Sequence, residues 1–273
     1  MTEPIKLIAV DMDGTLLRSD KTVDPQTITD IRAAVDRGIQ VAYCTGRGFA
    51  EMQEVFGILP EIRYGVLNSG AVIYDRAEDK FIYSNGVQQP YIQQFVDLAR
   101  QFSAMPHFLT DRESIVSKED VTHMADFHMS VYQTMFQTIG RLVDDMAEEG
   151  LRHDSIAKLN IYFRTAEDRA KAYEMFKGLP LQLSLSENTT LEFTAPSTSK
   201  GTGLTRLAEY LNIPMEQTAA IGDNYNDTEM LKAAGFAIAM GNAIDEIREM
   251  CDHITTDNDH NGVGQAIRYI MSL

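Results

Sequence analysis

Short apolar runs that alternate with helix-like segments are the feature that most restricts the fold of this chain. Apolar runs at 6–10 and 39–44 flank a helix-like segment, in which Asp24 fits the N-cap and Gly38 fits the position after the last turn. The same alternation returns from residue 204 to the C-terminus. Strands that alternate with helices form parallel sheets with helices on both faces. The sequence therefore predicts an α/β core.

The middle of the chain, residues 86–190, has a different pattern. Helices are predicted at 91–103 and 166–177, and several strand-like runs lie around them. Four of the six histidines fall in this part of the chain. We therefore predict one core formed by residues 1–85 and 191–273, interrupted by an inserted domain that mixes helices and strands.

The charge and composition of the chain restrict the classes of molecule that it can bind. The chain has 24 Lys and Arg against 40 Asp and Glu, a net charge of −16, and such a field repels nucleic acid and anionic lipid. A small anionic substrate would also be repelled, so its site needs concentrated positive charge. No membrane span or signal peptide is visible, and Cys44 and Cys251 have no metal-ligand spacing. We expect a cytoplasmic protein with reduced cysteines that binds neither nucleic acid nor membranes. Its oligomeric state is not predicted.

Two carboxylates directly follow the first predicted strand, in the run Asp11-Met12-Asp13-Gly14-Thr15. Ligands of open parallel sheets bind outside the carboxyl ends of the strands, so this run lies where a site is expected. Gly14 allows the sharp turn that would bring Asp13 back towards that site. An acidic turn after a strand is the structural alternative. We favour the functional interpretation of this motif.

The second predicted strand ends at Thr45-Gly46-Arg47, where a helix is expected to begin. A strand-to-helix junction of this kind presents free backbone N–H groups to a phosphate oxygen. The hydroxyl of Thr45 and the guanidinium of Arg47 add further donors. A capping threonine beside a solvated arginine explains the same residues equally well.

Two further pieces lie near the C-terminus. Lys200 opens a predicted helix, where a cation is unfavourable unless it faces an anion. Asp223, Asn226 and Asp227 follow another predicted strand, in a loop that could instead serve only as a polar turn. Together the strand ends carry oxygen ligands without histidine or cysteine, which suits magnesium (Mg²⁺) better than zinc. The cluster is typical of phosphoryl transfer.

With these motifs in view, the chain resembles the haloacid dehalogenase (HAD) superfamily, and more narrowly the Cof-type sugar-phosphate hydrolases. The resemblance covers the whole chain: four motifs occur in order, with a large insertion between the second and third. It implies a Rossmann-like parallel-sheet core with an inserted α/β cap domain of the C2B type. Three positions depart from the usual pattern of the family. Gly48 stands where a proline often follows the arginine, and Ser197-Thr198 stands in place of the common Gly-Val before the lysine. An additional residue, Ser69, separates Asn68 from Gly70. These departures leave substrate preference open.

The same resemblance implies a role for each motif residue. Asp11 would be the nucleophile and Asp13 the general acid and base, and Asp227 would orient Lys200 or a metal-bound water. Magnesium would be held by Asp11, Asp13 and Asp223, with Asp13 acting through its backbone carbonyl. The phosphate would contact Met12, Thr45, Gly46, Arg47, Lys200 and Asn226.

The expected activity is hydrolysis of a small phosphate ester, in particular a sugar phosphate. A phosphomutase of the same superfamily is one alternative, although residues 86–190 carry ten Lys and Arg against fifteen Asp and Glu, without a tight basic cluster. A non-catalytic binder of phosphorylated metabolites is another, although binding alone would not require Asp13. The candidates for recognition of the leaving group are His107, Asp111, Arg112, His123, His128 and Lys158.

Overall fold

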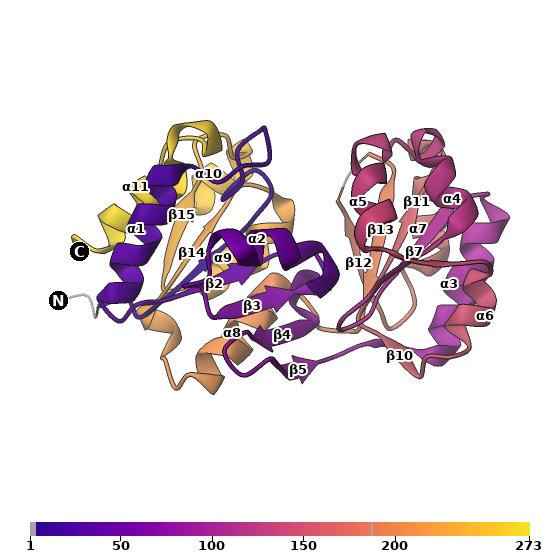
Figure 1. Cartoon of the computed structure of the whole chain (residues 1–273), viewed down its shortest axis with the longest axis horizontal. Coiled ribbons are helices and arrows are strands. Elements are labelled where there is room, and N and C mark those ends of the chain that lie inside the picture. Colours follow the sequence, from indigo (N-terminus) through magenta and orange to yellow (C-terminus); the bar gives the residue numbers. More distant parts are fainter. Residues whose placement is uncertain (1–3, 187) are drawn as a thin grey trace. The chain divides into compact units, whose positions relative to one another are not determined.

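The computed structural model describes residues 4–186 and 188–273, which form two compact units. The first unit contains the residues up to Gly46, Glu54–Tyr83 and Ser199–Leu273. The second contains Arg47–Gln53 and Ser84–Thr198 (Figure 1). Within the described ranges, no helix combines the length and the apolar character that crossing a bilayer requires.

An eight-stranded sheet, with the order β16-β15-β14-β1-β2-β3-β4-β5, forms the centre of the first unit. All neighbouring strands from β16 to β3 are parallel, whereas β4 is antiparallel to β3. The strands are β1 (Leu7–Val10), β2 (Gln40–Cys44), β3 (Tyr64–Leu67), β4 (Val72–Asp75), β5 (Lys80–Ser84), β14 (Thr218–Gly222), β15 (Phe236–Ala239) and β16 (His253–Ile254). The central strands are buried along their whole length, which explains their continuous apolar runs.

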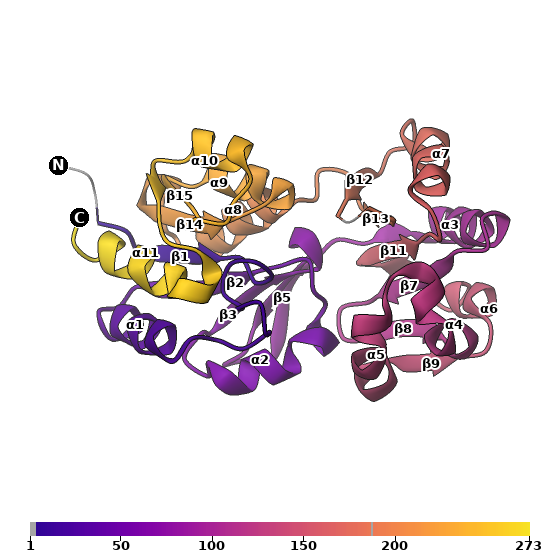
Figure 2. The same cartoon turned by 90° about the horizontal axis from the view of Figure 1, so that it is seen from above.

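Helices cover both faces of this sheet. Helices α1 and α11 pack together on one face, and α8 and α9 lie on the other (Figure 2). The helices are α1 (Pro25–Asp36), α2 (Gln53–Ile58), α8 (Lys200–Tyr210), α9 (Thr228–Ala233), α10 (Asp245–Met250) and α11 (Gly262–Ile270). The side chain of Asp24 caps α1 by accepting the N–H of Gln26, and Gly38 follows the helix at φ +82°. The predicted parallel α/β core is confirmed.

The second unit contains a six-stranded sheet with the order β12-β13-β11-β7-β8-β9. Its helices are α3 (Gln89–Gln101), α4 (Lys118–Thr122), α5 (Gln133–Ile139), α6 (Met146–Gly150) and α7 (Ala166–Phe176). Its strands are β7 (Met105–Leu109), β8 (Ser114–Ser117), β9 (Arg141–Val143), β11 (Lys158–Tyr162), β12 (Gln182–Leu185) and β13 (Thr190–Thr194), and β6 (Val87–Gln88) pairs separately with β10 (Ser155–Ile156). Apolar side chains of α3, α6 and α7 pack on one face, and those of α4 and α5 join a smaller cluster with β7 and β8.

The second unit does not have the boundaries that the sequence predicted. Residues 191–198 were assigned to the core, but β13 pairs with β11 and β12 inside the second unit. The segment Arg47–Gln53 also belongs to this unit, although it lies far from it in the chain. Strand pairing and distant contacts of this kind leave no local sequence signal.

Candidate active site

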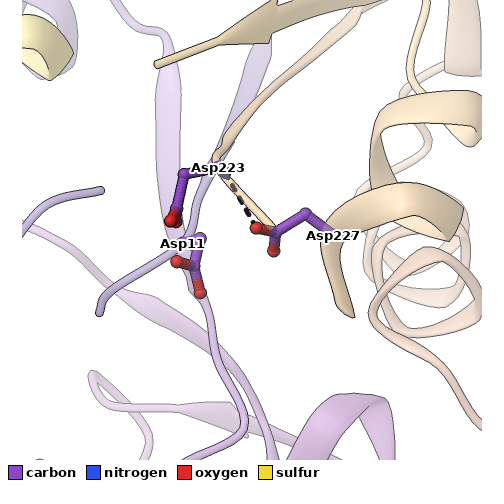
Figure 3. Close-up of side chains that lie close together, drawn as sticks. All are labelled: Asp11, Asp223 and Asp227. Carbon is purple, nitrogen blue, oxygen red and sulfur yellow. Dashed lines mark hydrogen bonds between the residues drawn. The ribbon is translucent and has the colours of Figure 1, made fainter. Parts of the chain in front are cut away.

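Four side chains meet in the first unit, at the carboxyl ends of two neighbouring strands. Asp11 follows β1 and Asp223 follows β14, and these strands are paired in parallel. Asp227 ends the short 3₁₀ helix Tyr225–Asp227 after β14. Lys200 is the first residue of α8. Figure 3 shows the three carboxylates close together, and each offers an oxygen within 4.8 Å of the others.

Lys200 connects two of these carboxylates. Its Nζ donates to Oδ1 of Asp11 at 2.5 Å and to Oδ1 of Asp227 at 2.6 Å. All three residues are at most 4% exposed. A cation in the first turn of a helix opposes the helix dipole, and here two anions compensate for it. Lys200 is therefore a buried, paired lysine and not a solvated one.

Both carboxylate oxygens of Asp227 accept hydrogen bonds, and these bonds fix the loop that follows β14. Its Oδ2 accepts the backbone N–H groups of Asp223 at 3.0 Å and Asn224 at 3.1 Å, while its Oδ1 binds Lys200. Thr15 donates its hydroxyl to Oδ1 of Asp223 at 2.8 Å. The second oxygen of Asp223 and the carboxylate of Asp11 are therefore the atoms best placed to bind a cation.

Gly14 allows Asp223 to approach the loop after β1. Its φ is +83°, a region that side chains other than glycine rarely adopt. A Cβ atom at this position would lie 2.5 Å from Oδ2 of Asp223. The glycine of the D-x-D-G-T motif is therefore required by the turn and also by the space that the Asp223 carboxylate occupies.

The cluster has more negative than positive charge. Burial raises the pKa of Asp11 well above its usual range; the neighbouring Asp227 and Asp223 raise it further, while Lys200 opposes them. Burial and Asp227 likewise raise the pKa of Asp223 to about 6. For Lys200, burial lowers the pKa, but Asp11 and Asp227 outweigh that effect and raise it. The four side chains thus combine one ammonium group with three carboxyl groups, two of which contact the ammonium.

This donor set fits a divalent cation. The three carboxylates supply only oxygen atoms, and such hard ligands suit magnesium and similar ions. A divalent cation would also compensate for the negative charge that Lys200 leaves unbalanced. The side chains present here are therefore compatible with metal-dependent chemistry.

The other residues predicted to contact the phosphate differ in their burial and in the unit to which they belong. Thr45 and Gly46 follow β2, the neighbour of β1, and Thr45 is buried. Met12 is buried, whereas Asn226 is exposed. Arg47 belongs to the second unit.

Asp13 does not join the three carboxylates. Its side chain is 41% exposed and forms an ion pair with Lys21, whose Nζ lies 3.0 Å from Oδ1 of Asp13. The turn at Gly14 therefore leaves this carboxylate at the surface of the first unit. No local sequence pattern predicts this pairing with Lys21.

Sequence reasoning also missed two residues that organise the loop after β1. Thr15 orients Asp223, and Asn242 donates from Nδ2 to the carbonyl of Gly14 at 2.8 Å. The Oδ1 atom of Asn242 accepts the N–H of Asn258 at 3.0 Å. Thr15 belongs to the predicted Asp11–Thr15 motif, but the partners of both residues are distant in the chain, so no local pattern indicates these contacts.

The candidates for recognition of the leaving group differ in burial. His107 and Lys158 are buried in the second unit, whereas His123 and His128 are exposed. His123 Nδ1 pairs with the carbonyl of Glu119, and His128 Nε2 with that of Arg164. Of the remaining two, Asp111 accepts a hydrogen bond from Ser84, and the guanidinium of Arg112 lies 5.2 Å from the ring centroid of Phe49.

Comparison with known proteins gives the same assignment along the whole chain. Residues 8–267 match the haloacid dehalogenase-like hydrolase family. The phosphatase YwpJ of Bacillus subtilis (strain 168) is 30% identical over 297 residues, which cover 98% of this chain and 100% of YwpJ. The 5-amino-6-(5-phospho-D-ribitylamino)uracil phosphatase YcsE of the same organism is 29% identical, over 97% of this chain and 95% of YcsE.

Comparison with solved structures finds proteins that have the same fold as this chain. A haloacid dehalogenase-like hydrolase from B. subtilis has a TM-score of 0.84 and 27% identity, and the match covers 97% of this chain and 99% of that one. The HAD subclass IIB sugar phosphatase BT4131 has a TM-score of 0.82 over 98% and 100% of the two chains; at 19% identity this likeness concerns the fold alone. The predicted fold class, a parallel-sheet core with an inserted α/β domain, is confirmed. The chain therefore belongs to the haloacid dehalogenase-like hydrolase family, and the prediction that it is a phosphatase of this family is confirmed.

Proposed function

We propose that the enzyme is a magnesium-dependent phosphatase that hydrolyses small phosphate esters, in particular sugar phosphates, through an aspartyl-phosphate at Asp11. The observation that supports this most strongly is the position of the Asp11 carboxylate, 2.5 Å from the ammonium of Lys200 and beside Asp223. The name of YcsE, a phosphatase of a phosphoribityl compound, points to a sugar-like leaving group.

In the first step, an oxygen of Asp11 attacks phosphorus in line with the ester bond. The bond between phosphorus and the alcohol oxygen breaks, and Asp13 donates a proton to that oxygen. Nucleophilic catalysis divides the hydrolysis into two easier displacements. Lys200 compensates for charge on the phosphoryl oxygens, and Asp227 holds the ammonium of Lys200 in place.

In the second step, water attacks the phosphorus of the aspartyl-phosphate. Asp13, now ionised, takes a proton from this water. The bond between phosphorus and Asp11 breaks, so that inorganic phosphate leaves and the carboxylate is restored. Thr45 and Lys200 would bind the phosphoryl oxygens in both steps, together with the backbone of Met12 and Gly46, and Arg47 and Asn226 would supply further contacts.

Magnesium would be held by the carboxylates of Asp11 and Asp223 and by the backbone carbonyl of Asp13. When bound, the ion supplies positive charge that screens Asp11 from an anionic substrate. Thr15 keeps Asp223 oriented for this role through its hydrogen bond of 2.8 Å.

We also propose that the second unit acts as a cap that determines substrate preference, and that the enzyme acts in the cytoplasm. The unit has its own sheet and its own apolar clusters, so its surface can vary without disturbing the residues around Asp11.

The decisive experiment measures phosphate release from a panel of sugar phosphates, nucleotides and simple alkyl phosphates, in EDTA and after magnesium is restored. We expect release that requires magnesium and is lost in Asp11→Asn. Conversion of a sugar phosphate to its isomer without phosphate release would instead indicate a phosphomutase. Tight binding of the ester without any release would indicate a binding protein.

A further inference from the structure

The loop 240–244, which follows β15 in the first unit, contacts both of the segments that carry proposed magnesium ligands. On one side, the backbone N–H of Ile244 donates to the carbonyl of Asp223 at 3.1 Å. On the other side, Nδ2 of Asn242 donates to the carbonyl of Gly14 at 2.8 Å, in the turn after β1. Strand β14 lies between β15 and β1 in the sheet, so this loop reaches past the end of β14 to the turn.

The turn after β1 and the side chain of Asp223 are in direct contact. Thr15 donates its hydroxyl to Oδ1 of Asp223 at 2.8 Å, and the missing Cβ of Gly14 leaves room for the other carboxylate oxygen. The carbonyl of Gly14 and the N–H of Thr15 belong to the same planar peptide unit. A hydrogen bond that fixes the Gly14 carbonyl therefore also restrains the peptide that leads into Thr15, and with it the orientation of Asp223.

The side-chain amide of Asn242 is held at both ends. Its Oδ1 accepts the backbone N–H of Asn258 at 3.0 Å, and Nδ2 of Asn258 donates to the carbonyl of Leu17 at 3.0 Å. An asparagine amide offers donors and an acceptor in one plane, so it suits a position between a carbonyl and an N–H group. The two asparagines thus link the loop after β1 to the segment after β16 at two points, Gly14 and Leu17.

Asn242 is an exposed residue, so its hydrogen bonds add less to the stability of the fold than buried ones do. Water can replace either partner of an exposed hydrogen bond. A metal site is more demanding, because the distances between a metal and its ligands vary by only about 0.2 Å. Residues that orient metal ligands therefore affect metal affinity strongly even where they contribute little to folding.

We propose that Asn242 is a positioning residue of the metal site. By holding the Gly14 carbonyl, it keeps the turn after β1 in the arrangement that binds a divalent cation. Thr15 transmits this restraint to the carboxylate of Asp223. The inference rests on the proposed magnesium-dependent function and adds to it a residue that is not itself a ligand and acts through Gly14 and Thr15.

The test measures magnesium binding to the full chain by isothermal titration calorimetry, without substrate. Asn242→Ala should raise the Kd for magnesium about tenfold or more, the usual effect of losing a residue that orients a metal ligand. Asn258→Ala is the matched control, because it removes a similar hydrogen bond from the same loop, but at Leu17, beyond Thr15. Its Kd should stay within about twofold of wild type. An unchanged Kd in Asn242→Ala, or equal increases in the two variants, would overturn the inference.

A metal-free measurement separates failure of the inference from failure of the proposed function. If the wild-type protein binds no magnesium, the proposed magnesium dependence fails, and denaturant unfolding in EDTA still tests the restraint on the turn. Because Asn242 and Thr15 hold the same peptide unit, the losses of stability in Asn242→Ala and Thr15→Val should not add in the double variant. Additive losses would overturn the positioning role of Asn242.

Discussion

The ammonium group of Lys200 lies 2.5 Å from Oδ1 of Asp11, and both side chains are buried. Two charges removed from water are costly, and a buried ion pair of this kind adds little to stability by itself. The carboxylate of Asp227 completes the arrangement on the other side of the ammonium. We infer that the contact is kept for chemistry, and the following predictions test this.

Asp11→Asn should abolish steady-state phosphate release and leave the fold intact. The amide is not a nucleophile for phosphorus, and it has the size of the protonated acid that burial favours at this position. Phosphate release and circular dichroism provide the measurements. Asp36→Asn, an exposed carboxylate in α1, is the control and should behave as wild type. Measurable steady turnover by Asp11→Asn would refute nucleophilic attack by this residue.

Asp13→Asn should reduce turnover by about 10²- to 10⁴-fold, the usual contribution of a general acid and base. The loss should be larger for hexyl phosphate than for p-nitrophenyl phosphate, because only the alkoxide leaving group needs a proton. Comparing kcat/KM for the two esters gives the measurement, because kcat/KM does not include the later hydrolysis of the aspartyl-phosphate, which is the same for both. An equal loss with both esters, or a loss below about tenfold, would show that Asp13 does not protonate the leaving oxygen.

Lys200→Met should destabilise the protein by about 3–5 kcal/mol, because it leaves buried carboxylates without their cation. Magnesium should recover part of this loss by supplying positive charge to Asp11 and Asp223. Denaturant unfolding in EDTA and in magnesium gives both quantities. In the double variant Lys200→Met/Asp227→Asn the loss should be smaller than the sum of the single losses, since the two residues are in contact. Additive losses would contradict this coupling.

Gly14→Ala should lose magnesium binding as well as stability. The new Cβ would lie 2.5 Å from Oδ2 of Asp223 and would displace this carboxylate. Gly38→Ala is the matched control, because Gly38 has nearly the same φ, +82°, but no atom within 4 Å of the new Cβ. Gly38→Ala should cost about 1–2 kcal/mol and keep normal magnesium affinity. Equal magnesium affinity in the two variants would show that the space around Asp223 is not critical.

The contribution of Asp223 to the free energy of unfolding should fall with rising pH in the metal-free protein and should rise with pH when magnesium is present. In the metal-free protein the pKa of Asp223 is raised from 3.8 to about 6, so the folded state binds this proton more tightly than the unfolded chain. Its contribution to stability is therefore lost as the pH rises from about 4 to about 6. Magnesium requires the ionised carboxylate, so the stabilisation by magnesium should increase over the same range.

Thermal unfolding of wild type and Asp223→Asn, with EDTA or magnesium, measures this effect. The difference between the two proteins isolates Asp223 from the other titrating groups. In EDTA, the variant should lose less stability than wild type between these pH values. An identical pH profile for both proteins would contradict the raised pKa of Asp223.

Local patterns were sufficient to predict the parallel core, the strand ends that precede Asp11 and Asp223, and the helix that begins at Lys200. The apolar runs before Asp11 and Asp223 end where β1 and β14 end, so the sequence correctly predicts that both residues follow strands. Helix punctuation placed Lys200 in the first turn of α8. These features depend on residues near one another in the chain, and the carboxyl ends of parallel strands always meet at one edge of a sheet.

Tertiary structure decided which distant groups meet. Because β13 pairs with β11, Glu192 lies beside Asn160, and residues 191–198 belong to the second unit. The pairing of Asp13 with Lys21 depends on how the loop after β1 folds back. Register and side-chain direction are determined by contacts between segments that are far apart in the chain, so no local pattern carries them.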